Sequence, residues 1–249
     1  MKTTDNTVLI TGGSAGIGFE IAKALVEKGN KVIITGRDAS RLESAQKQLK
    51  DAVVIPFDVT DAQQVEQLVQ RLNQEFPELN VVVNNAGKAF LHHLSNNTNS
   101  FGAASEEILT NYLSIVRLNE ELLPLLNKQQ EGAIVNVSSM VAFAPPVMLS
   151  TYAASKAALH SYTQSLRLTL SKNTSIRVFE LIPPLVNTAF SKEIGGGQGI
   201  SPAVVAEELL KAMEREEHEI HVGDTAQISA LSRKSPQEAL MVMNQSFLN

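Results

Sequence analysis

Cysteine and tryptophan are absent from this 249-residue sequence. Without cysteine the chain can form no disulfide, no thiolate nucleophile and no cysteine-ligated metal site. Long apolar runs are missing too, since every apolar stretch is well short of the roughly 18 residues that a membrane-spanning helix needs. The polar start, Met1 to Asn6, contains no apolar core of signal-peptide length. We therefore expect a soluble, cytoplasmic protein with no membrane partner.

Positive charge is also scarce, because 21 lysines and arginines stand against 26 aspartates and glutamates, for a net charge of −5. Binding to the phosphates of a nucleic acid requires a clustered basic face, so we expect no nucleic-acid partner. His218 and His221 lie three apart and bracket a predicted strand, where odd spacing points side chains to opposite faces, so we expect no metal site. We interpret His92 and His93 as solvated loop residues, with the lining of a substrate entrance as the alternative.

Short β-branched runs alternate with longer amphipathic stretches, which is typical of βαβ units around a parallel sheet. The predicted strands are Thr7–Thr11, Lys31–Thr35, Ala52–Ile55, Asn80–Asn84, Gly132–Ser138, Ser175–Leu181 and Glu219–Val222. The predicted helices are Gly16–Lys28, Ser40–Lys50, Ala62–Glu75, Ser105–Asn127, Thr151–Leu170 and Pro202–Arg215. These elements fill the length, so we expect one α/β domain over residues 1–249. Its predicted fold is doubly wound, of the Rossmann type, with a seven-stranded parallel sheet flanked by helices on both faces.

Three segments lie outside these regular elements. Residues 189–200 contain the glycine-rich patch 195–199, and we expect them to close over a substrate as a loop. Residues 89–102 are expected to form the opposite wall. The tail, 223–249, is weakly patterned, with one short docking helix predicted at Ala239–Met243.

The first predicted strand runs into Thr11-Gly-Gly-Ser-Ala-Gly-Ile-Gly18 and then into a helix. In such a strand–turn–helix context, Gly12 permits a tight turn, and Gly16 lets the backbone approach a pyrophosphate. Gly18 allows close packing of the helix on the strand. The helix N-terminus offers free N–H groups for the phosphates. The alternative is a glycine-rich connection without a ligand.

Tyr152 and Lys156 lie four apart at the start of a predicted helix and so share one face. A phenol has a pKa near 10 and is a poor acid–base catalyst at pH 7 until that pKa falls. A neighbouring ammonium stabilises the phenolate and lowers the pKa of the phenol. Taken alone, the same spacing is also common on ordinary solvated helices.

The spacing Gly-x3-Gly-x-Gly after a threonine resembles the nucleotide loop of the short-chain dehydrogenase/reductase family. Asn84-Asn85-Ala86-Gly87 resembles the segment that ends the family's fourth strand, and the resemblance extends from Thr7 to about Val222. It implies an oxidoreductase that interconverts a carbonyl and a primary or secondary alcohol by hydride transfer, with a nicotinamide dinucleotide as cofactor. It also implies a homodimer or homotetramer.

The same resemblance implies four catalytic residues. Ser139 precedes Tyr152 by thirteen residues, the usual distance in the family, and would donate to the substrate oxygen while Tyr152 transfers the proton. Lys156 would lower the pKa of the tyrosine and hold the ribose. Asn111 would hold a water that links the lysine to solvent, with a solvated helix asparagine as the alternative. Ser138 is interpreted as structural, although a shift of one residue is possible.

The residue after the second strand bears on the choice of cofactor. Arg37 follows Gly36, an arrangement that resembles the family members preferring NADP, and its planar guanidinium suits a 2′-phosphate. Asp38 supports the NAD alternative, because an acidic residue near this place binds ribose hydroxyls in NAD enzymes. The second basic residue of some NADP enzymes is missing, since Ala15 stands in its place. We predict NADP, with Asp38 as a helix cap.

Further cofactor contacts are implied by the resemblance at Gly12, Ser14, Gly16, Ile17, Gly18, Asp58, Val59, Asn85, Ala86, Gly87, Tyr152, Lys156, Pro183, Val186 and Thr188. Two residues depart from the family pattern, because Pro184 and Ala142 stand at or near places where glycine is usual. Proline removes a backbone donor and fixes φ, which alters the chain near the nicotinamide. The Pro183–Pro184 pair resembles the subgroup associated with the D-alanine–teichoic acid operon.

Two other classes of protein compete with this interpretation. A dinucleotide-binding sensor or interaction protein can use the same fold, but such proteins typically lose one of the four catalytic positions. Related epimerases and dehydratases usually carry Gly-x2-Gly-x2-Gly and a longer C-terminal substrate domain, for which this chain has no room.

Overall fold

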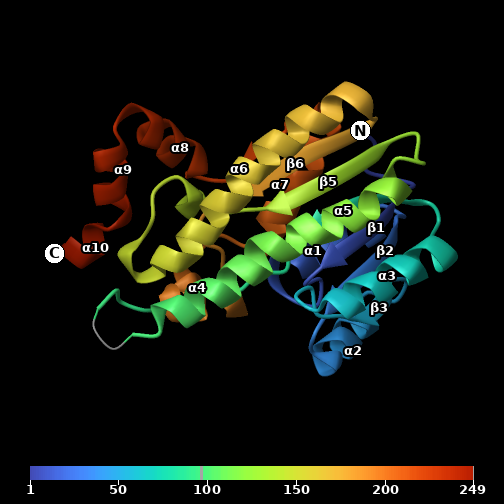
Figure 1. Cartoon of the computed structure of the whole chain (residues 1–249), viewed down its shortest axis with the longest axis horizontal. Helices are drawn as coiled ribbons and strands as arrows, with labels where there is room; N and C mark the ends of the chain where they lie inside the picture. Colours follow the sequence, from blue (N-terminus) through green and yellow to red (C-terminus); the bar gives the residue numbers. More distant parts are fainter. Residues whose placement is uncertain (96–97, 249) are drawn as a thin grey trace.

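In residues 1–95 and 98–248, which the computed structural model describes, seven parallel strands form one sheet (Figure 1). The strands are β1 (Thr7–Thr11), β2 (Lys31–Gly36), β3 (Val53–Pro56), β4 (Leu79–Asn84), β5 (Gly132–Val137), β6 (Ile176–Ile182) and β7 (Glu219–His221). Their spatial order is β3-β2-β1-β4-β5-β6-β7. The order reverses between β1 and β4, and the carboxyl ends of strands at such a reversal are where ligands bind in open α/β sheets.

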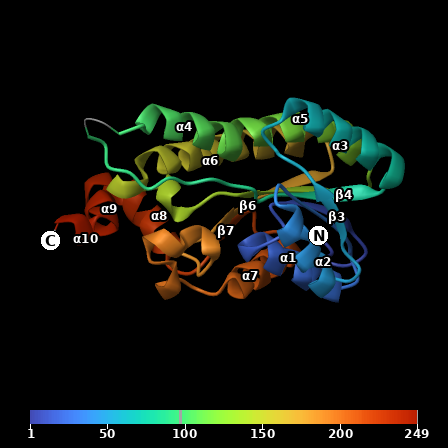
Figure 2. The ribbon, with the colours of Figure 1, turned by 90° about the horizontal axis from the view of Figure 1, so that it is seen from below.

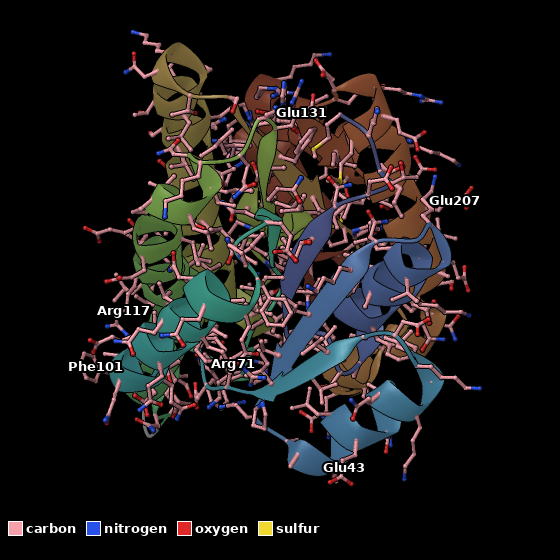
Figure 3. The ribbon with its side chains drawn as sticks, turned by 90° about the vertical axis from the view of Figure 1, so that its right-hand side faces the viewer. Glu43, Arg71, Phe101, Arg117, Glu131 and Glu207 are labelled. Carbon is pink, nitrogen blue, oxygen red and sulfur yellow. The ribbon has the colours of Figure 1, made fainter. Side chains whose placement is uncertain are left out.

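Helices cover both faces of this sheet, as predicted (Figure 2). One face carries α1 (Gly16–Glu27), α2 (Ala39–Gln48) and α7 (Pro202–Arg215). The other face carries α3 (Ala62–Glu75), α4 (Ser100–Ile108), α5 (Ser114–Leu126) and α6 (Ser150–Asn173). Figure 3 shows the same division, with Glu207 on one side of the sheet and Arg71 and Arg117 on the other. The central strands are buried on both faces and therefore consist of nearly continuous apolar residues.

The helix predicted at Ser105–Asn127 begins five residues earlier, at Ser100. The side chain of Asn99 caps it by accepting a 3.2 Å hydrogen bond from the amide of Gly102. A single π-helical turn, Leu109–Leu113, joins α4 to α5. Such turns insert one residue into a helix and are frequent at functional sites.

The tail contains more structure than its sequence pattern predicts. Three helices follow β7 in the described part of the chain: α8 (Thr225–Lys234), α9 (Pro236–Met243) and α10 (Gln245–Leu248). The predicted docking helix Ala239–Met243 forms the second half of α9, and residue 249 lies outside the described residues. Figure 1 shows these helices together at one end of the molecule. Asn244 attaches them to the loop before α6 by accepting a 2.7 Å hydrogen bond from the amide of Val147.

Within residues 1–95 and 98–248, no helix is both long enough and apolar enough to cross a membrane.

Candidate active site

The glycine loop after β1 has the shape of a phosphate cradle. Gly12 and Gly16 have φ angles of +66° and +58°, which glycine adopts without the strain that a side chain would bring. A Cβ at Gly16 would lie 3.2 Å from the Thr188 side chain. The helix α1 starts after Ala15, which supplies no side-chain cap, so the first N–H groups of α1 are free to bind an anion. These residues fit the pyrophosphate of a dinucleotide.

The loop after β4 is joined directly to this cradle. The Thr11 hydroxyl accepts hydrogen bonds from the amides of Asn85 (3.0 Å) and Ala86 (3.1 Å). The Asn85 side chain donates to the Gly12 carbonyl oxygen at 3.1 Å. A Cβ at Gly18 would collide with the Asn85 side chain. The two motifs therefore form one unit at the point where the strand order reverses.

Arg37 and Asp38 have different environments at the end of β2. Arg37 is exposed, and its guanidinium lies 3.9 Å from the carboxylate of Asp58 at the end of β3. Asp38 caps α2, because its carboxylate accepts a 3.1 Å hydrogen bond from the amide of Arg41. The prediction of a helix cap at Asp38 is thus confirmed, whereas the exposed guanidinium of Arg37 has only a long contact with Asp58.

Tyr152 and Lys156 lie on consecutive turns of α6, which packs over β6 (Figure 1). Both side chains are buried, and Lys156 Nζ lies 5.7 Å from the centre of the Tyr152 ring. The ammonium group donates a 2.8 Å hydrogen bond to the carbonyl oxygen of Val137, the last residue of β5. The end of β5 therefore fixes the lysine beside the tyrosine.

Burial dominates the acid–base properties of this pair. Burial raises the pKa of the Tyr152 phenol, a hydrogen bond with Ser139 lowers it, and the Glu107 carboxylate raises it. Burial lowers the pKa of Lys156 and the Glu180 carboxylate raises it, with a net fall to about 8. Charged forms lose solvation when buried, so both groups depend on their neighbours for their charge.

The two serines after β5 differ in their contacts. The Ser139 hydroxyl acts on the Tyr152 phenol by lowering its pKa, and it also caps a 3-10 turn by accepting from the amide of Val141 at 3.4 Å. The Ser138 hydroxyl is buried and has no hydrogen-bond partner among the described residues. Of the two, Ser139 is the serine placed beside the tyrosine.

Asn111 lies in the π-helical turn, fully buried. Its side-chain nitrogen donates to the Lys88 carbonyl oxygen and to the Ser155 hydroxyl, each at 2.8 Å. Its side-chain oxygen accepts from the amide of Lys88 at 2.8 Å. These three hydrogen bonds fasten the segment after Gly87 to α6.

Glu107 is a site residue that the sequence analysis missed. It is fully buried on α4, and one carboxylate oxygen accepts a 2.7 Å hydrogen bond from the amide of Phe90. The other oxygen is buried without a partner among the described residues. The signal in the sequence is its position four residues before Asn111, which places both on one helix face.

The segment after β6 carries the residues predicted to hold the nicotinamide. The Pro183 carbonyl oxygen accepts a 3.0 Å hydrogen bond from the amide of Met140, beside Ser139. Val186 pairs with Ile200, which closes residues 189–200 into a loop of two 3-10 turns. From this loop the ring of Phe190 lies 6.1 Å from that of Tyr152.

An apolar cluster around Tyr152 includes residues from the predicted wall and from the tail. Leu91 packs against it from residues 89–102, of which 96–97 lie outside the described residues. Ile228 of α8 and Ala239 of α9 belong to it. The contribution of the tail is a second feature that the sequence analysis missed, because α8 has little apolar patterning.

His218 and His221 take the places expected from their spacing, whereas His92 is partly buried, with its Nε2 lacking a partner among the described residues, and is not the solvated loop residue that was expected. His218 lies against Phe179, which belongs to the core under α1 and α7, whereas His221 stacks on Phe143, which contacts α6. They therefore face opposite sides of the sheet. His93 is exposed, with its ring 6.2 Å from that of Phe247 in α10.

The chain is similar to known proteins over most of its length. A family model described as short chain dehydrogenase matches residues 6–199. The chain is 44% identical over 201 residues to the uncharacterized oxidoreductase DltE of Bacillus subtilis, which covers 81% of this chain and 79% of the relative. An uncharacterized oxidoreductase of Staphylococcus saprophyticus is 33% identical over 225 residues, with 88% and 95% covered.

Two solved structures share the fold. A short chain dehydrogenase from Burkholderia cenocepacia in complex with NADP is 25% identical, with a TM-score of 0.85 over 97% of this chain and 98% of that chain. A short chain dehydrogenase/reductase from Burkholderia phymatum in complex with NAD is 19% identical, with a TM-score of 0.87 over 98% and 97%.

Proposed function

The chain belongs to the short-chain dehydrogenase family, and we propose that it is an NADP(H)-dependent oxidoreductase that interconverts a carbonyl and a primary or secondary alcohol. The observation that carries the proposal is one cluster of side chains. The Ser139 hydroxyl lowers the pKa of Tyr152, and Lys156 lies one turn farther along α6, with Nζ 5.7 Å from the centre of the Tyr152 ring. Asn111 fastens the neighbouring loop to the same helix through Ser155.

In the direction of reduction, we assign Ser139 to donate a hydrogen bond to the carbonyl oxygen. Tyr152 then transfers its proton to that oxygen, and Ser139 remains in contact with both. The positive charge of Lys156 stabilises the phenolate that forms. NADPH, when bound, supplies the hydride from nicotinamide C4. In alcohol oxidation Tyr152 acts as the base.

The dinucleotide is assigned to the cradle after β1. The free N–H groups of α1 and the loop glycines Gly12 and Gly16 would hold its pyrophosphate. The exposed guanidinium of Arg37 would hold the 2′-phosphate of NADP by charge-assisted hydrogen bonds. The other residues assigned to the dinucleotide are Ser14, Ile17, Gly18, Asp58, Val59, Asn85, Ala86, Gly87, Tyr152, Lys156, Pro183, Val186 and Thr188. The Burkholderia cenocepacia structure holds NADP and the Burkholderia phymatum structure holds NAD, so the preference for NADP depends on Arg37.

The substrate is assigned to the space bounded by residues 189–200, residues 89–102 and the tail. The apolar cluster around Tyr152 favours a small molecule with an apolar part next to its carbonyl group. We also propose that residues 1–249 act as one catalytic domain and that the protein is a homodimer or homotetramer. Phe101 and Leu168, exposed on α4 and α6, support an interface on that side of the molecule.

The test is the oxidation of NADPH by the purified protein with a panel of ketones, aldehydes and quinones, followed at 340 nm. We expect turnover with at least one class, and a higher kcat/KM for NADPH than for NADH. Tight NADPH binding without turnover on any class would favour the sensor alternative instead. A large preference for NADH would overturn the assignment of Arg37.

A further inference from the structure

Asn244 joins the C-terminal tail to the loop before α6, residues 143–149. It lies at the C-cap of α9 and is 5% exposed. Its side-chain oxygen accepts a 2.7 Å hydrogen bond from the amide of Val147, and its side-chain nitrogen donates to the Pro145 carbonyl oxygen at 3.0 Å. The same nitrogen donates to the Leu240 carbonyl oxygen in α9 at 2.8 Å. One buried amide group thus binds both its own helix and a loop 97 residues earlier in the chain.

The loop that Asn244 binds lies between Ser139 and Tyr152, the serine and the tyrosine of the proposed catalytic residues. Two consecutive prolines precede Val147, and proline has no N–H group. The amide of Val147 is therefore the first backbone donor after them, and Asn244 is its partner. The carbonyl oxygen of the following residue accepts a 3.2 Å hydrogen bond from the amide of His92, in the segment after β4. The loop is thus held from two sides, and the tail supplies one of them.

Apolar packing contributes little to the attachment of the tail. In the described residues 223–248, the buried apolar side chains are those of Ile228 in α8 and Ala239 in α9. The consecutive residues 240–242 of α9 are apolar but 42–55% exposed. A buried methyl group removes little apolar area from water. The position of α9 therefore depends strongly on the hydrogen bonds of Asn244.

The attached tail is one side of the apolar cluster around Tyr152. Ile228 and Ala239 belong to this cluster, together with Leu149 of the loop that Asn244 binds. From α10, the ring of Phe247 lies 6.2 Å from that of His93 in the segment after β4. The tail therefore contacts both the loop before α6 and the segment after β4.

We propose that Asn244 is a positioning residue for the substrate, because its two hydrogen bonds to the loop before α6 fix the distance between the tail and Tyr152. The apolar part of a carbonyl compound would lie in the cluster against Ile228, and the fixed tail then limits its length. This substrate role rests on the proposed function, whereas the attachment of the tail does not. Asn244 acts through the position of the tail and takes no part in proton or hydride transfer.

The attachment is tested by hydrogen–deuterium exchange of the whole protein, measured by mass spectrometry on peptides from α8 and α9. Asn244→Leu keeps a side chain of similar size but removes all its hydrogen bonds. We expect the amides of α8 and α9 to exchange about tenfold faster, the equivalent of one lost buried hydrogen bond. The strands of the sheet should exchange as in wild type. Unchanged exchange of α8 and α9 in a folded Asn244→Leu protein overturns the proposal.

Val147→Pro breaks the same contact from the other side and remains informative if Asn244→Leu does not fold. Val147 is the first residue of a 3-10 turn, a place where proline is tolerated. Pro146 before it has a ψ of 138°, which is within the range allowed before a proline. The substitution therefore removes the N–H donor without straining the loop.

Val147→Ala is the control for the loss of the valine side chain. We expect faster exchange of α8 and α9 in Val147→Pro than in Val147→Ala, and a smaller effect than in Asn244→Leu, because the bond to Pro145 remains. Since both substitutions remove one shared contact, the double variant should release the tail no further than Asn244→Leu alone. Equal exchange in Val147→Pro and Val147→Ala contradicts the proposal.

The effect on substrate is measured with methyl ketones of increasing chain length, starting from acetone. In Asn244→Leu, KM for the short ketones should rise by about tenfold, because the tail no longer packs against them. Long ketones should lose less, and KM for NADPH should stay nearly unchanged. Asn127→Leu is the matched control, since Asn127 is an exposed asparagine at the C-cap of α5, and it should behave as wild type in exchange and kinetics.

The two measurements separate the proposal from the proposed function. If the tail is released in Asn244→Leu but wild type reduces no carbonyl compound, the attachment stands and the proposed function fails. If wild type turns over and release of the tail leaves the order of preference among the ketones unchanged, the positioning role is wrong. An equal rise of KM for NADPH and for every ketone would indicate a general loosening of the fold and would also contradict that role.

Discussion

Glu107 accepts a 2.7 Å hydrogen bond from the amide of Phe90 with one carboxylate oxygen. One turn farther along the same helix, Asn111 binds both the amide and the carbonyl oxygen of Lys88. The two side chains therefore hold alternate residues of the extended segment that follows Gly87. This segment would separate the proposed cofactor site from the proposed substrate site.

Glu107→Gln should lower the pKa of Tyr152, because the variant removes a negative charge that raises it. The glutamine oxygen can still accept from the Phe90 amide, so the wall should keep its place. Tyr152 acts as a base in alcohol oxidation, and the acid limb of kcat/KM should therefore move to lower pH. Glu106→Gln is the control, since the exposed Glu106 pairs with Lys88. This variant should leave the acid limb of kcat/KM at the same pH as in wild type. Equal profiles for wild type and Glu107→Gln would contradict this role.

Tyr152→Phe should reduce kcat by about 100-fold or more, the usual contribution of a positioned general acid. The ring that packs in the apolar cluster is retained, so NADPH affinity and thermal stability should remain near wild type. The measurements are steady-state kinetics and NADPH fluorescence titration. A fully active phenylalanine variant is incompatible with the proposed mechanism.

Ser139→Ala should lower kcat by about 100- to 1,000-fold, the range for loss of one donor to a developing oxyanion. Ser138→Ala should change kcat little, because the Ser138 hydroxyl has no partner among the described residues. Comparing the two single variants assigns the catalytic serine. The reverse order of effects would move the role to Ser138.

Arg37→Ser should raise KM for NADPH by about tenfold or more, which corresponds to the loss of one charge-assisted contact to phosphate. KM for NADH, which lacks the 2′-phosphate, should change little. Arg41→Ser is a suitable control, because Arg41 is exposed on α2 and pairs with Asp38 at 3.3 Å. Equal losses with NADPH and NADH would show that Arg37 does not contact the 2′-phosphate.

His160 should make the stability of the fold depend on pH. The hydrogen bond to Glu180 raises the pKa of His160, and burial opposes it. A raised pKa means that the stabilisation is fully present below the ordinary value of about 6.5 and is lost as the pH rises through the folded value. Below pH 6.5 we expect Tm of His160→Gln to lie about 2–4 °C below wild type, with the gap narrowing at higher pH.

His93→Gln provides the comparison for this measurement, since His93 is exposed in the loop after β4. Its Tm should follow that of wild type across the whole pH range. A gap for His160→Gln that stays constant with pH would indicate lost packing against Phe143 and not a titrating ion pair.

The fold was largely readable from the sequence because hydrophobic period and glycine placement are local signals. The seven strands begin and end within one residue of their predicted positions. The family resemblance and its subgroup are confirmed by the match to residues 6–199 and by the relative DltE. The helix predicted from Ser105 begins five residues earlier in the structure, because residues 100–104 carry little apolar periodicity. Of the three tail helices, only the part of α9 at Ala239–Met243 is predicted; α8 and α10 are missed for a related reason, since the tail depends on docking against the loop before α6.

The site was readable only where its residues sit in a motif. Tyr152, Lys156 and the glycine loop have fixed spacings, whereas Glu107 and Glu180 meet their partners across 17 and 20 residues of intervening chain. One signal for Glu180 was present, because a glutamate in the middle of the buried strand Ile176–Ile182 needs a partner. The sequence does not name that partner, since α6 offers several polar side chains and the register of helix on sheet is a tertiary property.

The helix α6 separates the residues proposed to transfer the proton from the segments proposed to bind the substrate. Tyr152, Lys156 and the histidine bonded to Glu180 are all carried by one helix of 24 residues, so their mutual spacing is set by helix geometry. The parts assigned to the substrate lie elsewhere, in residues 189–200 and in the tail. Substitutions in residues 189–200 and in the tail could therefore change the substrate preference without changing the relative positions of Tyr152 and Lys156.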